Sequence, residues 1–119
     1  MIRRFGDAPS VPTRAQQIWL VLIGKAANRQ SMTYGDLADV LGFAGAGTLA
    51  QFLEPVLRYC DGESLPPLTV LVVNQDTGIP GTGIGIAEQD PHRLREQVYT
   101  YDWYDLVPPT VEDFKAALA

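Results

Sequence analysis

The sequence predicts a small α+β domain of the winged helix-turn-helix type. Apolar residues recur at helical spacing through the first half of the chain, a dense β-branched run occupies Leu68–Val73, and glycine-rich turn chemistry follows that run. The chain has 119 residues, of which 46% are hydrophobic. This length and composition suit one domain, spanning 1–119, with a hydrophobic core of its own.

The first helix is expected to start near Thr13 and to end at Asn28. Residues 1–11 should form a loose leader, because Pro9 and Pro12 oppose early helix formation. The apolar residues of the helix recur every three or four positions and form one stripe: Ala15, Ile18, Trp19, Leu22, Ile23 and Ala26. The longest apolar run here is too short to cross a bilayer, so we predict no membrane segment.

A helix-turn-helix is predicted over residues 33–60. Thr33 is a favourable N-cap with Asp36 at the capping-box position, and Gly42 is placed to end the helix. Its predicted inward-facing residues are Leu37, Ala38, Val40 and Leu41. A third helix should bury Leu49, Phe52, Leu53, Val56 and Leu57. Pro55 lies within this helix and is expected to kink or interrupt it, because proline lacks the backbone donor.

A strand and wing hairpin is predicted over residues 68–86. Leu68–Val73 should be the strand, Asn74–Gly78 the turn, and residues 79–87 an irregular return segment. The remaining residues, 90–119, form an aromatic and acidic packing region with two helix starts. Asp90 precedes a proline in a first-turn position, and Thr110 stands three residues before Asp113.

The segment TYGDLA, Thr33–Ala38, resembles a helix start in the DNA-binding domain of alkylguanine-DNA alkyltransferases and alkyltransferase-like proteins. Pro66 and Pro67 lie roughly where the proline-led strand of that family begins, so the resemblance covers about half of the chain. It implies a winged-helix fold and binding to nucleic acid. The reactive Pro-Cys-His-Arg motif of the family is absent here, which removes the carrier of alkyl-acceptor chemistry. We therefore predict a non-enzymatic binding module.

The candidate nucleic-acid contacts are Tyr34, Thr48, Gln51 and Arg58. The resemblance implies that Tyr34 presses on the backbone beside a flipped nucleotide. The other three would contact the groove from the recognition helix, since amide and hydroxyl groups read bases and phosphates. The family places an intercalating arginine at the start of this helix, but residues 45–51 contain no basic residue. The alternative is that these side chains form the solvated face of a core helix.

Charge points instead to a protein partner. Residues 1–58 hold six basic and four acidic residues, a net charge of +2, whereas residues 59–119 hold three basic and ten acidic residues, a net charge of −7. An acidic surface repels phosphate and attracts a basic protein. The candidate contacts for such a partner are Tyr101, Asp102, Trp103, Tyr104 and Asp105, because aromatic residues dominate binding energy at protein interfaces. The alternative is that these aromatic residues close the core.

Architecture thus favours nucleic acid as the partner, charge favours a basic protein, and both functions stay open. The protein-binding class would include inhibitors, immunity proteins and anti-defence proteins. A third hypothesis is a small enzyme that uses Cys60 and His92 as a nucleophilic pair. The alternative is that Cys60 is a core residue and His92 is simply exposed to solvent. The glycine-rich run from Gly78 to Gly85 is not predicted to be a phosphate-binding loop, because no lysine and no helix start directly follow it. No metal or cofactor is expected, and the lone cysteine fits a cytoplasmic location.

Overall fold

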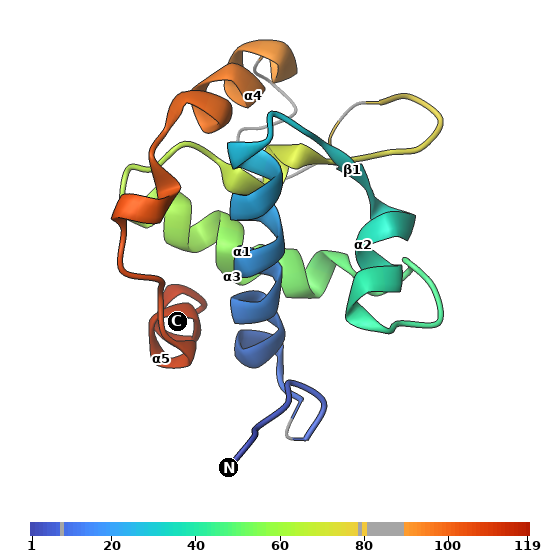
Figure 1. The fold of residues 1–119 in the computed structure, drawn as a ribbon, viewed down its shortest axis with the longest axis vertical. Coiled ribbons are helices and arrows are strands. Elements are labelled where there is room, and N and C mark those ends of the chain that lie inside the picture. Colours follow the sequence, from blue (N-terminus) through green and yellow to red (C-terminus); the bar gives the residue numbers. More distant parts are fainter. Residues whose placement is uncertain (8, 79, 81–89) are drawn as a thin grey trace.

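The computed structural model describes residues 1–7, 9–78, 80 and 90–119. Figure 1 shows the arrangement of the helices and strands. In chain order they are α1 (Val11–Ala27), β1 (Met32–Thr33), α2 (Tyr34–Leu41), α3 (Ala50–Gly62), η1 (Leu68–Leu71), β2 (Val72–Val73), α4 (Pro91–Thr100), η2 (Trp103–Asp105) and α5 (Val111–Ala117). The Cα radius of gyration, 13.5 Å, is typical of one compact domain of this length. The predicted α+β class is confirmed.

Helix α1 stands at the centre of the fold and contacts α2, α3, α4 and α5 (Figure 1). All six residues of its predicted apolar stripe are buried. The helix begins at Val11, earlier than expected, because the Ser10 side chain caps it by accepting a hydrogen bond from the Thr13 amide. Pro12 falls in the first turn, where a missing N–H costs nothing. Proline therefore starts this helix and does not delay it.

Helix α2 begins as predicted. The Thr33 side chain accepts a hydrogen bond from the Asp36 amide, and Asp36 accepts one from the Thr33 amide. Gly42 ends the helix in the left-handed region with φ of 78°. The inward orientation predicted for Val40 is wrong, because its side chain is 55% exposed. It lies at the edge of the buried face, roughly 60° around the helix from Leu37 and roughly 100° from Leu41, where the core no longer covers it.

Helix α3 runs through Pro55 without a break, so the restart predicted as one possibility does not occur. Pro55 is buried together with Leu53, Val56, Leu57 and Cys60. Its ring therefore contributes to the core at the position where the helix loses one backbone hydrogen bond. The connection from Gly42 to Leu49 is longer than the roughly three- to four-residue turn of a tight helix-turn-helix.

The strand predicted over Leu68–Val73 is largely wrong. Leu68–Leu71 forms the 3-10 helix η1, and only Val72 and Val73 are extended. A continuous apolar run indicates burial but does not distinguish a strand from a buried helical turn. The amide of Val70 donates to the Pro67 carbonyl, and η1 packs against α1, α3 and α4. Packing among three helices has overridden the β propensity of these residues.

The two strands form a parallel pair in which Met32 lies opposite Val72 and Thr33 lies opposite Val73. The strand at Met32–Thr33 was not predicted from the sequence. The turn at Asn74–Gly78 is confirmed, since the Gly78 amide donates to the Asn74 carbonyl and the chain then meets Val73 again in an antiparallel bridge at Pro80. The rest of the predicted wing, residues 79 and 81–87, lies outside the described residues.

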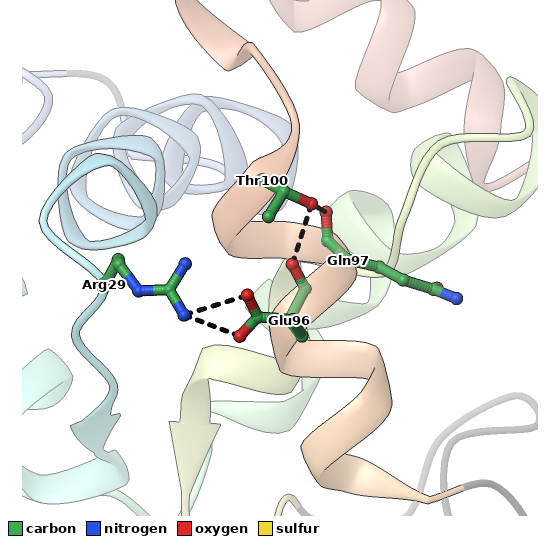
Figure 2. Close-up of polar contacts among 4 residues, drawn as sticks. All are labelled: Arg29, Glu96, Gln97 and Thr100. Carbon is green, nitrogen blue, oxygen red and sulfur yellow. Dashed lines mark hydrogen bonds and ion pairs between the residues drawn. The ribbon is translucent and has the colours of Figure 1, made fainter.

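Both predicted C-terminal helix starts are confirmed. The Asp90 side chain accepts from the His92 amide at the start of α4, and Thr110 and Asp113 form a reciprocal capping box at the start of α5. Figure 2 shows how α4 is held against the end of α1. Arg29 donates to both carboxylate oxygens of Glu96, at 2.9 and 2.6 Å.

Candidate interaction surface

The four residues predicted to contact nucleic acid do not form one basic site. Tyr34 is the first residue of α2 and packs partly against the core. Thr48 is exposed in the connection before α3, whereas Gln51 and Arg58 are exposed on α3. The last two lie about two helical turns apart on one side of the helix.

Arg58, the one cation of this set, is already paired. Its Nε donates to the Glu54 carboxylate at 2.7 Å. Arg58 also lines a cleft of about 320 Å³ with Tyr59, Glu63 and Asp113. Burial, and then the carboxylates of Glu63 and Asp113, raise the pKa of Tyr59. The cleft at the C-terminal end of α3 is therefore acidic, which opposes binding to a phosphate backbone there.

Two further cations of the N-terminal half have structural roles. The Arg14 guanidinium donates to Gln17 and to the Leu41 carbonyl and lies 5.1 Å from the centre of the Phe43 ring. The Arg29 guanidinium pairs with Glu96, which raises the pKa of Arg29, and lies over the Tyr99 ring. Both guanidinium groups are engaged within the protein: Arg14 joins α1 to the end of α2, and Arg29 joins the end of α1 to α4.

The aromatic and acidic segment divides into a buried part and an exposed part. Trp103 is 3% exposed, its indole N–H donates to the Val98 carbonyl at 2.8 Å, and its ring meets Trp19 edge-on with centroids 5.5 Å apart. Tyr101 is half-buried and packs on Trp103 with a centroid distance of 4.8 Å. Trp103 therefore belongs to the core and Tyr101 packs against it, as the alternative interpretation of the aromatic cluster expected.

Tyr104 is the solvent-exposed aromatic residue of this segment. Its side chain is 65% exposed, and Asp102 and Asp105 on either side are exposed as well. The Tyr104 hydroxyl lies over α1, where a Cβ atom added to Gly24 would be 3.9 Å away. That separation is an ordinary van der Waals distance, so the hydroxyl end of Tyr104 lies close to α1 at Gly24.

The connection from η2 to α5 descends in Figure 1, opposite to the direction of α1. Two contacts bring its ends close to α1. Tyr104 lies at Gly24, and the Gln16 side chain donates to the Pro109 carbonyl at 3.4 Å. Leu20 lies between Gln16 and Gly24 on the same side of α1, since residues four apart share a helix face.

Apolar side chains are exposed between these two contacts. Leu20 is 48% exposed and Val107 is 88% exposed. We call Leu20, Asp102, Tyr104, Asp105 and Val107 the acidic aromatic surface. Three of the five were predicted from the sequence as contacts for a protein partner, whereas Leu20 and Val107 were not. Leu20 carried a usable signal, because it is a large apolar residue outside the stripe that packs α1 into the core.

Cys60 and His92 do not form a reactive pair. Cys60 is fully buried in α3, and burial raises the pKa of its thiol to about 11. A nucleophilic cysteine has a lowered pKa, so this thiol has the wrong protonation state for catalysis at neutral pH. His92 is exposed on α4, where its Nδ1 atom lies 2.9 Å from a guanidinium nitrogen of Arg95.

Among the helices built from described residues, none combines the length and the apolar character needed to cross a bilayer. In the same part of the chain, His, Cys, Asp and Glu side chains do not gather in threes at a possible metal site. No family model, curated protein or solved structure matches this sequence.

Proposed function

We propose that this protein is a non-enzymatic binding module that takes a basic segment of a protein partner on its acidic aromatic surface. The observation that carries the proposal is the position of Tyr104. It is a large, exposed aromatic side chain between two exposed carboxylates, with exposed Leu20 and Val107 beside it. This combination of an aromatic anchor, apolar neighbours and charges at the rim is typical of a protein interface.

Each part of the surface has its own role in the proposal. Tyr104 and Leu20 bury apolar area against the partner and supply most of the binding energy. Asp102 and Asp105 attract a basic segment and set its orientation, which mainly affects the association rate. The net charge of −5 extends this attraction beyond contact distance at low salt.

We also propose that the scaffold is a winged helix like that of the alkyltransferase-like proteins. The order of α1, β1, α2, α3 and β2, and the capping box within TYGDLA, support this proposal. On this scaffold, nucleic-acid binding is the second candidate function. It is favoured by the position of Tyr34 at the first turn of α2 and disfavoured by the acidic surroundings of Arg58.

Fluorescence anisotropy with two labelled peptides tests the main proposal. One peptide alternates lysine with leucine and tyrosine, and the other has the same charge but serine in place of the apolar residues. We expect the first to bind more tightly. Tyr104→Ala should weaken its binding at least about tenfold, and Asp102→Asn with Asp105→Asn should reduce the association rate and its salt dependence. The matched control is Val40→Ala, another exposed apolar residue.

A mobility-shift assay with a pool of duplex and single-stranded DNA and RNA separates the two functions. The main proposal predicts no salt-sensitive shift. A shift at low salt that Tyr34→Ala or Arg58→Ala removes, and that Tyr104→Ala leaves unchanged, would favour nucleic acid. Equal binding of the two peptides, or unchanged binding by the Tyr104 variant, would refute the assignment of the acidic aromatic surface.

A further inference from the structure

The acidic aromatic surface leads along α1 to a cleft with the opposite charge. This cleft has a volume of about 730 Å³ and is lined by leader residues including Arg3, Arg4 and Phe5, by Gln16 of α1, and by Val111 at the start of α5. Gln16 is the residue that contacts Pro109 at the lower end of the acidic aromatic surface. The two features are therefore neighbours on one side of the molecule.

The two arginines of the cleft are available to a partner. Arg3 and Arg4 are exposed, and within the described residues neither forms a salt bridge. Asp7 also lines the cleft, and its carboxylate accepts a hydrogen bond from the Arg4 amide at 3.0 Å. One acid against two guanidinium groups leaves the cleft with a positive balance.

Three zones thus follow one another along α1. Asp102, Tyr104 and Asp105 form an acidic end at the level of Gly24. Leu20 and Val107 form an apolar middle, and Arg3 and Arg4 form a basic end at the level of Thr13. Thr13 and Gly24 are separated by about 16 Å of helix, and Leu20 lies near the midpoint. We call this succession the polar strip.

A strip with this order is complementary to itself. A twofold axis through the apolar middle reverses the direction of the second strip. It therefore places the basic end of each copy against the acidic end of the other, and the two apolar zones against each other. A surface that matches its own copy in this way is what a symmetric dimer requires.

We propose that the polar strip is the interface of a twofold homodimer, in which Arg3 and Arg4 of each copy contact Asp102 and Asp105 of the other. This inference rests on the proposed function, because it uses the same surface and identifies the basic segment as the leader of a second copy. The apolar contact through Leu20 and Val107 supplies binding energy, and the paired charges set the direction. Both charged zones lie at the rim, so salt weakens the association.

Sedimentation equilibrium with three charge variants tests this arrangement. The wild-type protein should approach twice its 13.0 kDa mass as its concentration rises toward about 1 mM. The double variant Asp102→Arg, Asp105→Arg has two basic ends, and the double variant Arg3→Glu, Arg4→Glu has two acidic ends. Each should be monomeric alone. Their equimolar mixture should form a heterodimer, and the quadruple variant should dimerise again.

Val40→Asp is the matched control, because it adds a charge at an exposed apolar residue of α2 and should leave the mass unchanged. Wild-type protein that stays monomeric at about 1 mM overturns the dimer. In that case, peptide binding that depends on Tyr104 would show that the proposed function stands without it. Self-association that the charge variants leave intact, or that their mixture fails to restore, overturns the twofold arrangement.

Discussion

At the scale of single residues, neighbouring aromatic side chains in one segment have different roles. The Trp103 indole is enclosed by Trp19, Tyr101 and the Val98 carbonyl, whereas the next residue, Tyr104, faces solvent. The 3-10 turn at Trp103–Asp105 produces this difference, because successive side chains of a helical turn point in different directions. Trp103 is therefore a residue for stability, and Tyr104 is free to serve binding.

Substitution of Trp103 by Phe should destabilise the protein. The change removes the N–H donor and leaves the Val98 carbonyl without its partner in a buried position, which costs about 1–3 kcal/mol. Urea unfolding followed by circular dichroism measures the loss. Tyr104→Phe is the control and should change the free energy of unfolding by less than about 0.5 kcal/mol. Equal effects of the two substitutions would contradict the division between core and surface.

The buried thiol of Cys60 predicts a loss of stability at high pH. Folding raises the pKa of this thiol from its ordinary value of 9.0 to about 11. Between these values the unfolded chain has lost the proton and the folded chain keeps it, so stability falls as pH rises from about 9 to about 11. Urea midpoints across this range should fall less in Cys60→Ala than in the wild-type protein. Parallel pH profiles would contradict this role.

At the scale of elements, short helices depend on their caps. Helix α5 carries the buried Phe114, whose ring contacts those of Trp19 and Tyr59. Its start is held by a capping box in which the Thr110 hydroxyl accepts from the Asp113 amide at 3.1 Å and the Asp113 carboxylate accepts from the Thr110 amide at 2.8 Å. Because a helix of this length has little stability of its own, the cap and the Phe114 contact hold it jointly.

Thr110→Ala should therefore destabilise the protein by about 1 kcal/mol, the usual effect of losing an N-cap side chain. Thermal or urea unfolding measures this difference. Thr110→Ser keeps the hydroxyl and should restore most of the stability. A serine variant as unstable as the alanine variant would show that the methyl group of Thr110, and not its hydrogen bond, is the important part.

Arg29, which follows the end of α1, contacts two residues of α4. This residue has φ of 54°, in the left-handed region that favours glycine, and it pairs with Glu96 while lying 5.0 Å from the Tyr99 ring centre (Figure 2). Arg29→Ala keeps the unfavourable backbone conformation and removes both contacts, so we expect faster hydrogen exchange of α4 amides. Arg29→Gly should exchange more slowly than the alanine variant. The reverse order would refute the role of the backbone at this position.

At the scale of the whole molecule, one core joins all the helices. The two tryptophans belong to α1 and η2, meet edge-on, and lie in the same buried cluster as residues of α2, α3 and α4. We therefore expect a single cooperative unfolding transition. Tryptophan fluorescence and far-UV circular dichroism should give the same urea midpoint. Separate midpoints would show that part of the helical structure unfolds independently of this core.

Much of the fold was predictable because its signals are local. The stripe of α1, the capping box at Thr33, the left-handed Gly42 and the caps of α4 and α5 all depend on residues within one or two helical turns. The run Leu68–Val73 was mispredicted because its conformation depends on contacts with α1, α3 and α4. The parallel pairing of Met32 with Val72 joins residues far apart in the sequence, and no local pattern indicates it.

The candidate surface shows the same limit. Tyr104, Asp102 and Asp105 could be identified by residue type, but the separation of Tyr104 from the buried Trp103 required the packed structure. Leu20 and Val107 join this surface only because Tyr104–Pro109 runs along α1. The pairing of Arg58 with Glu54 follows from their spacing of four residues on one helix, but Asp113 of α5 joins Arg58 in one cleft only in the folded protein.

The amino-acid sequence by itself determined the α+β class, where most of the helices begin and end, and the acidic character of the second half of the chain. Composition, helical periodicity and capping residues act locally, and they can be recognised without knowing the fold. The tertiary structure alone decided which aromatic residues are exposed, that Arg29 pairs with Glu96, and that acidic, apolar and basic zones follow one another along α1. Those properties arise from distant segments packed side by side, and their free energies depend on burial that only the complete fold creates.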